Sequence, residues 1–247
     1  MWYNSVKDAI PNDWRVKLHN SSYLQIVNYE LTVNLHNGKR KLSLVKTKDV
    51  YWTFISFIVR KPTAICKWQE MYPESNFDWQ YIYMIPYFAN VRDVKLQSLH
   101  YQILHRFFPC NYTLNKWYSD INKECTYCSE NDTLEHYFYN CNKLKCFWSS
   151  FFKWWFNITE TQFGIHALDI VLGIQNQNND NLINLLNYCI LQAKVYIYDC
   201  KYDNKECLFY EFQTVLKNTL DSEHLFYAEK GHLEQFTGTF GKVYINL

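Results

Sequence analysis

Apolar residues recur every three or four positions over most of this chain, a spacing typical of amphipathic helices. The clearest case is 90–108, where one stripe carries Leu96, Leu99, Ile103 and Phe107. Residues 182–200 repeat that spacing. Shorter helices are expected over 47–60, 62–71, 77–86, 114–118, 141–157 and 205–220. The pattern therefore predicts a mainly α protein.

Strict alternation of apolar and polar residues is confined to a region near the N-terminus. Residues 29–35 alternate, Asn37-Gly38 follows, and alternation resumes over 42–44. Asn-Gly between two alternating runs is a strong signal for a β-hairpin. The basic triplet 39–41 (Lys-Arg-Lys) lies just past the turn. It is either a solvated tip that protects an edge strand or a contact for phosphate.

The same pattern predicts which side chains form the core. Val50 and Phe54 should be buried on the first of these helices, and the Trp- and Phe-rich face of 147–155 should fill the core. Cys146 is expected to be one more buried apolar side chain. The tail, 227–247, is less regular and is expected to pack across an earlier helix.

Composition agrees with long helices joined by short loops. Aromatic residues make up 19% of the chain, whereas Gly (6) and Pro (5) are scarce. The sequence shows no internal repeat and no long linker. We distinguish three segments. Residues 1–89 contain an amphipathic opening (1–19), the hairpin and helices. Residues 90–160 contain a basic helix and a Cys/His motif, and residues 161–247 contain the C-terminal helices. These segments are expected to form one continuous compact unit.

Charge and cysteine usage narrow the class of protein. The net charge is +1, so any contact with nucleic acid must come from local patches and not from a global field. No apolar run approaches about 18 residues, so no membrane span is expected. Nine cysteines at irregular spacing, after a polar start without a signal-peptide pattern, argue against a disulfide framework. We expect reduced thiols in an intracellular protein, nuclear or cytoplasmic, that is not secreted.

The sharpest chemical signal is Cys125-x2-Cys128-x7-His136-x4-Cys141, a CCHC knuckle. Three thiolates and one imidazole are a usual ligand set of structural Zn²⁺, and four ligands leave no position to activate water. On a straight α-helix, the last two ligands would lie roughly 140° apart. We therefore expect the turn that carries the histidine to loosen at the last cysteine. The alternative is chance proximity in a chain with nine Cys and eight His.

Motifs of the common enzyme classes are missing. The sequence has no P-loop, no dinucleotide-binding glycine motif, no G-x-S-x-G and no H-E-x-x-H. Zinc deaminases need H-x-E with P-C-x-x-C, whereas Glu124 precedes Cys125 here. We expect no enzymatic activity from this chain alone and no small-molecule substrate.

Several stretches together resemble a known family. The run 95–106, Lys-Leu-Gln-Ser-Leu-His-Tyr-Gln-Ile-Leu-His-Arg, precedes the Cys/His motif, and Phe147-Trp148 follows it. This order is similar to the zinc-binding segment C-terminal to the reverse transcriptase in LINE-type (non-LTR) retrotransposon polyproteins. Stretches 44–52, 62–68 and 187–198 also resemble that region, so the resemblance covers most of the chain.

The resemblance implies a helical, zinc-stapled module that helps a polymerase hold its RNA template and target DNA. It assigns one structural Zn²⁺ to Cys125, Cys128, His136 and Cys141. It also implies nucleic-acid contacts from Lys95, His105 and Arg106, for which a solvated helix face is the alternative. Partners would be RNA or DNA and the reverse transcriptase domains of a parent polyprotein.

Two other interpretations stay open. The near-neutral charge favours a protein-interaction or scaffold module whose zinc only staples the fold, whereas the basic helix beside the knuckle favours nucleic acid. The polymerase palm and the endonuclease are missing from this sequence, so a retrotransposon remnant without a function is the third interpretation. RNA binding that weakens steeply with salt separates the first two.

Overall fold

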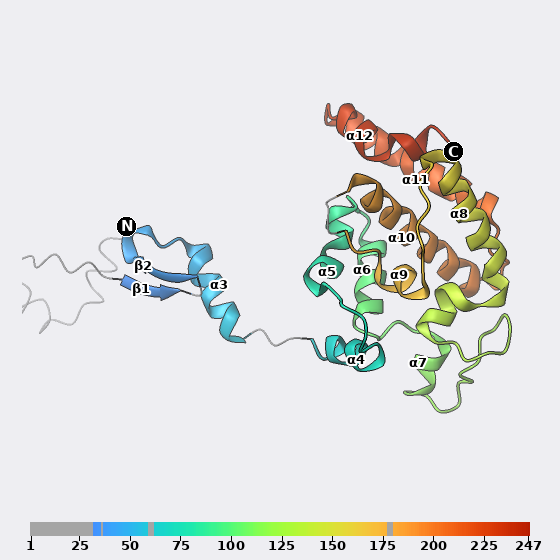
Figure 1. Cartoon of the computed structure of the whole chain (residues 1–247), viewed down its shortest axis with the longest axis horizontal. Coiled ribbons are helices and arrows are strands. Elements are labelled where there is room, and N and C mark those ends of the chain that lie inside the picture. Colours follow the sequence, from blue (N-terminus) through green and yellow to red (C-terminus); the bar gives the residue numbers. More distant parts are fainter. Residues whose placement is uncertain (1–31, 36, 59–61, 177–179) are drawn as a thin grey trace, which may run out of the picture. The chain divides into compact units, whose positions relative to one another are not determined.

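The computed structural model describes residues 32–247 except 36, 59–61 and 177–179. The expected amphipathic opening (1–19) and the first part of the expected first strand lie outside these residues. The described chain is mainly α-helical with one small antiparallel hairpin (Figure 1). The predicted fold class is therefore confirmed.

In the first of two compact units, the described residues form the predicted hairpin and a helix that follows it. Strands β1 (Thr32–Leu35) and β2 (Gly38–Lys41) pair antiparallel. Gly38 has φ +114°, a value that glycine adopts without strain, which explains the Asn-Gly signal at the turn. A 3₁₀ turn, η1 (Leu42–Leu44), leads into helix α3 (Thr47–Ile58).

An ion pair connects the hairpin to α3. The guanidinium of Arg40 lies 3.6 Å from the carboxylate of Asp49. That carboxylate belongs to a buried residue and also accepts the backbone N–H of Lys46 at 3.1 Å. Arg40, from the basic triplet 39–41, therefore has a structural partner inside its own unit.

The second unit begins at residue 62. Its elements are α4 (Thr63–Met71), α5 (Trp79–Phe88), α6 (Val94–Leu104), α7 (Asn111–Asn115), η2 (His136–Asn140), η3 (Asn142–Leu144), α8 (Lys145–Thr159), α9 (Ala167–Leu172), α10 (Asn181–Tyr202), α11 (Phe209–Glu229) and α12 (Leu233–Tyr244). The expected segments 90–160 and 161–247 both belong to this unit, and the boundary between the units lies within 1–89. Within the described part of the chain, no helix combines the length and the apolar character needed to cross a bilayer.

Helix α10 lies at the centre of the second unit (Figure 1). Every residue from Leu185 to Ile197 is buried, and the helix contacts α5, α6, α11 and α12. The side chain of Asp180 accepts the N–H of Leu182 at 2.8 Å and caps the N-terminus. Because α10 is buried on all sides, its polar residues need partners inside the protein.

Aromatic rings fill the space between α8 and α11. Phe147 and Phe151 of α8 meet Phe212 of α11 with ring centroids 5.6 and 6.0 Å apart. Such pairs contribute about 0.5–1.5 kcal/mol beyond the area they bury. The predicted core-filling face of α8 is confirmed for most of its residues, whereas Phe152 is only half-buried.

Helix α6 ends at Leu104, earlier than predicted. Arg106 has φ +59°, and the N–H groups of Arg106 and Phe107 donate to the carbonyls of Ile103 and Gln102 at 3.0 and 3.1 Å. This is the Schellman pattern of a helix C-terminus, here with arginine in the left-handed position. Phe107 consequently leaves the predicted apolar stripe and is 40% exposed.

Three further predictions about the core were wrong. Val50 and Phe54 are 37% and 64% exposed, because among the described hairpin residues only Leu35 is buried and offers an apolar surface. Cys146 is exposed, since other positions of α8 form its buried face. The tail is more regular than predicted because it contains α12, whereas its predicted packing across an earlier helix is confirmed by the contact of α12 with α11. The buried stripe of α12 includes Phe236, Phe240 and Val243.

Lys194 is a fully buried cation in the middle of α10. Its Nζ donates to the carbonyl of Val171 at 3.1 Å, and desolvation lowers the pKa of Lys194 to about 7. His100 is buried nearby, and desolvation together with the charge of Lys194 lowers the pKa of His100 to about 3. The imidazole therefore stays neutral, and Lys194 has no carboxylate partner among the described residues.

We expect Lys194→Met to stabilise the protein, and most strongly near neutral pH. The pKa of Lys194 falls from 10.5 to about 7 on folding. The cost of burying the ammonium is thus fully present below about pH 7 and fades toward the unfolded pKa, by at most about 1.4 kcal/mol per pH unit. Denaturant unfolding near pH 7 and near pH 9.5 measures the gain, with Lys67→Met at an exposed position of α4 as control. An equal gain at both pH values would contradict this account.

Candidate metal centre

The first two cysteines of the motif lie in a tight turn between α7 and η2. The N–H of Cys125 donates to the carbonyl of Glu130 at 2.7 Å, and the N–H of Ser129 donates to the carbonyl of Cys125 at 3.0 Å. The N–H of Tyr127 donates to Cys125 Sγ at 3.4 Å, a bond that favours the thiolate. The turn brings the sulfurs of Cys125 and Cys128 within 4.8 Å of each other.

A π-helical turn, η2, brings the other two ligand residues together. The N–H of Cys141 donates to the carbonyl of His136 at 3.2 Å, which is the i→i+5 bond of a π-helix. This wider turn closes on the fifth residue, where an α-helix would leave the two side chains roughly 140° apart. Cys141 then adopts an extended backbone, with φ −60° and ψ 127°. The predicted loosening of the turn at Cys141 is confirmed.

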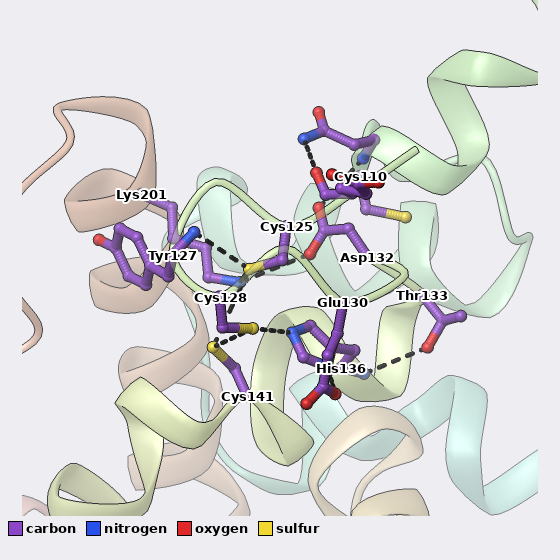
Figure 2. Close-up of polar contacts among 12 residues, drawn as sticks. Cys110, Cys125, Tyr127, Cys128, Glu130, Asp132, Thr133, His136, Cys141 and Lys201 are labelled. Carbon is purple, nitrogen blue, oxygen red and sulfur yellow. Dashed lines mark hydrogen bonds and ion pairs between the residues drawn. The ribbon is translucent and has the colours of Figure 1, made fainter. Parts of the chain in front are cut away.

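Three sulfurs and one imidazole nitrogen converge at this site (Figure 2). Cys141 Sγ lies 3.9 Å from Cys125 Sγ and 3.7 Å from Cys128 Sγ, and His136 Nε2 lies 3.1 Å from Cys128 Sγ. A tetrahedral ion with bonds of about 2.3 Å to sulfur holds its sulfur ligands about 3.8 Å apart. The four side chains can therefore hold a metal ion, and their spacing and chemistry are compatible with zinc.

A carboxylate supports the histidine from its other side. Glu130 Oε2 lies 3.4 Å from His136 Nδ1, so that Nε2 is left for the sulfur cluster. Metal-bound histidines commonly donate their second N–H to such a carboxylate, which fixes the ring orientation. His136 is buried, whereas Glu130 is more than half exposed and lies at the edge of the site.

Lys201 reaches the site from the buried helix α10. Its Nζ lies 3.8 Å from Cys125 Sγ and 3.6 Å from Asp132 Oδ1, and the side chains of Lys201 and Asp132 are each 4% exposed. The ammonium also lies 4.0 Å from the ring centroid of Tyr137. At this position the cation stabilises both the thiolate and the carboxylate, which would otherwise be buried without compensation.

Asp132 connects the metal loop to the start of α7. Its Oδ2 accepts the N–H of Asn111 at 3.1 Å, and its own N–H donates to the carbonyl of Lys123 at 2.9 Å. Burial raises the pKa of Asp132, while the charge of Lys201 and the bond from Asn111 oppose that rise. The charged carboxylate therefore depends on Lys201.

The cysteines of the cluster differ in acidity. The hydrogen bond between Cys141 and Cys125 lowers the pKa of Cys125, and the same contact raises the pKa of Cys141. The N–H of Tyr127 and the charge of Lys201 lower the pKa of Cys125 further. Because a metal binds thiolates, these contacts favour coordination by Cys125.

The sequence pattern identified the four ligand residues but none of their supporting groups. Glu130 and Asp132 lie in the seven-residue gap of the motif, where the spacing of the ligand residues gives no sign of their contacts. Lys201 lies on another helix, far along the chain from the knuckle. One sequence signal could have pointed to Lys201. It is a charged residue in a long helix that carries apolar residues on every face, so it needs a partner inside the protein.

The structure places the three nucleic-acid candidates at opposite ends of α6. Lys95, in the first turn, forms an ion pair with Asp199 at 2.8 Å. The side chains of the two residues are 53% and 50% exposed. His105 and Arg106 follow the last turn. The three candidates are thus not brought together at one point.

His105 and Arg106 both pack against aromatic rings. The His105 ring lies 4.1 Å from the ring of Tyr101, and desolvation lowers the pKa of His105. The guanidinium carbon of Arg106 lies 4.4 Å from the ring centroid of Trp68. Each side chain therefore has a contact inside the protein, and phosphate binding by these residues stays a prediction.

We expect Cys128→Ser to lose the metal ion. Binding energy at a structural metal site is part of the folding energy, so residues from about 110 to 157 should lose hydrogen-exchange protection together. Elemental analysis measures metal per chain, and exchange mass spectrometry reports the segment. Cys146→Ser, at an exposed cysteine outside the cluster, is the matched control. Unchanged metal content in Cys128→Ser would refute the ligand assignment.

Lys201→Met should destabilise the metal-loaded protein by about 3–5 kcal/mol, because it leaves the carboxylate of Asp132 buried without a cation. The double variant Lys201→Met/Asp132→Asn should recover part of that loss, since the amide carries no charge and its oxygen can still accept the N–H of Asn111. Denaturant unfolding of the native chain, both single variants and the double variant gives the coupling energy. Strictly additive losses would show that the two charges are not coupled.

Comparison with known proteins assigns no family to this chain. No protein-family model matches it, and no curated protein sequence matches it. The function is therefore inferred from the site itself and from the resemblance described above.

Proposed function

We propose that the chain is a zinc-stabilised nucleic-acid-binding module without catalytic activity of its own. The observation that carries this proposal is the convergence of four ligand atoms within 4.8 Å, from Cys125, Cys128, His136 and Cys141. A set of three thiolates and one imidazole favours zinc over magnesium or calcium, which prefer oxygen ligands. Four protein ligands complete the coordination, so the role of the ion is structural.

The order of elements around the knuckle supports binding of nucleic acid. Helix α6 with its basic residues precedes the knuckle and the aromatic helix α8 follows it, as in the segment downstream of the reverse transcriptase in LINE-type retrotransposons. In that setting the module helps the polymerase hold its RNA template and target DNA. Lys95, His105 and Arg106, at the two ends of α6, are the candidate contacts before the knuckle. Lys95 is half exposed, so its ammonium can exchange Asp199 for a phosphate.

The second candidate function is a protein-interaction or scaffold module, which the net charge of +1 favours. In that case the zinc only staples the fold, and cationic side chains serve internal ion pairs such as the pair of Lys95 with Asp199. A retrotransposon remnant would fold in the same way and bind nothing. The three alternatives differ in one measurable property, which is binding of nucleic acid.

We expect one zinc per chain and binding of single-stranded RNA that weakens with salt. Each phosphate that the protein neutralises contributes about −0.7 to the slope of log K against log salt. Elemental analysis gives the zinc content, and fluorescence anisotropy with a labelled RNA across about 50–200 mM salt gives affinity and slope. One zinc per chain without binding of RNA or DNA would contradict the proposal and leave the scaffold or the remnant.

A matched pair of variants tests the α6 contact in the same assay. If Lys95 contacts phosphate, Lys95→Gln weakens binding and makes the slope less negative, whereas Asp199→Asn frees the ammonium and strengthens binding. If Lys95 serves only the ion pair at 2.8 Å, both variants bind like the native chain. Because the pair is exposed, neither change should unfold the protein.

A further inference from the structure

Two adjoining hollows follow one face of helix α8. The larger has a volume of about 490 Å³ and the smaller about 340 Å³. Tyr139 and Phe152 line both, so we treat them together as the α8 groove. The groove is also lined by Lys145, Trp148, Lys153, Trp155 and Phe156.

The charged side chains that line the α8 groove are both cations. Lys145 and Lys153 are exposed, and no aspartate or glutamate lines either hollow. Neither lysine forms an ion pair with any residue that the structure describes. They lie eight positions apart, or about 12 Å along the helix axis. The groove therefore carries two uncompensated positive charges along its length.

Aromatic rings form a row beside these lysines. Trp148 and Phe152 stack with ring centroids 5.7 Å apart and an interplanar angle of 22°, and Tyr139 lies 6.0 Å from Trp148. Phe156, one helical turn beyond Phe152, is 48% exposed. The groove thus offers ring faces next to its cations.

The π-helical turn beside the candidate metal centre forms one wall of the groove. Tyr139 and Asn140 line it from the π-helical turn η2, between the ligand residues His136 and Cys141. Helix α8 follows Cys141 after the short turn η3. Ligation of the metal therefore fixes both the Tyr139 wall and the start of the helix.

We propose that the α8 groove binds a single-stranded segment of RNA or DNA. Bases stack on the rings of Phe152 and Phe156, and the ammonium groups of Lys145 and Lys153 neutralise phosphates along the strand. Exposed rings beside unpaired cations suit single strands, because a duplex keeps its bases stacked on each other. The inference rests on the proposed function and locates it on α8, at a surface separate from the three candidates of α6.

Other occupants match the groove less well. An apolar helix would cover the rings but would also desolvate two ammonium groups without a counter-charge. An acidic peptide would satisfy the lysines but would leave the row of rings without planar groups to stack on. Nucleic acid uses both features at once, through phosphates for the cations and bases for the rings.

The test uses the full chain loaded with zinc and a labelled single strand of about 15 nucleotides, near the upper site size of one small binding module. The strand is made as RNA and as DNA. The double variant Lys145→Gln/Lys153→Gln should bind at least about tenfold more weakly near 100 mM salt, and its slope of log K against log salt should be less negative by about 1.4. Phe156→Leu, at a half-exposed ring, should weaken binding about tenfold with the slope unchanged.

Lys230→Gln is the matched control. Lys230 follows α11, about 30 Å along that helix from Phe209, and Phe209 is the end that packs on Phe147 of α8. This variant should bind like the native chain. The assay also shows whether the native chain binds one kind of strand, RNA or DNA, more tightly than the other. If this preference disappears in the double variant, the result supports the proposal and shows which nucleic acid the groove prefers.

Two results would overturn the inference while leaving the proposed function intact. One is native binding that the double variant retains with the same affinity and salt slope. The other is an acidic peptide of equal length that binds the native chain more tightly than either strand and loses that binding in the double variant. If the native chain binds neither RNA nor DNA, the proposed function and the α8 groove both fail.

Discussion

A buried cation connects the metal loop to the helical core. The ammonium of Lys201 lies 3.6 Å from the carboxylate of Asp132 and 3.8 Å from the sulfur of Cys125. The carboxylate and the thiolate keep their charges at this depth because the ammonium is beside them, and the ammonium is buried at acceptable cost because of them. The loop, two of its charged groups and the central helix α10 are consequently interdependent, so the metal centre is part of the core and not an appendage.

This interdependence determines the position of α8 as well. Cys141 completes the ligand set and ends the π-helical turn, and α8 begins after a single turn of 3₁₀ helix. The buried face of α8 then packs Phe147 and Phe151 against Phe212 of α11. A helix held at its start by the metal ligands and along its side by aromatic packing presents its opposite residues at fixed positions. A groove on that helix is therefore preformed, which lowers the entropy lost when a ligand binds.

The features that the sequence predicted are those with a fixed local spacing. Helical periodicity, the Asn-Gly hairpin, the four ligand residues and the loosened turn between His136 and Cys141 each follow from residues close in the chain. Features that depend on tertiary partners were missed. The contact of Lys201 with Cys125 joins residues 76 positions apart, and the exposure of Val50 reflects how little apolar surface the described hairpin residues offer. The early end of α6 depends on Arg106 in a left-handed conformation that its residue type does not suggest.

The net charge of +1 is a poor guide to whether this chain can bind nucleic acid. Many of its acidic groups are already paired with cations in the fold, as in Arg40 with Asp49 and Arg92 with Glu223. Such pairs cancel at short range and contribute little field at a distance, because salt screens exposed charges beyond about 10 Å. A phosphate group interacts mainly with the charges nearest to it. The charged residues that line the α8 groove are two lysines, and no carboxylate lines it. Lys95 and Lys153 look equivalent as helical lysines in the sequence, yet only Lys95 has a carboxylate 2.8 Å away among the described residues. The carboxylate beside Lys95 comes from Asp199 of α10. This difference is the reason that we propose α8, and not α6, as the surface for a phosphate chain.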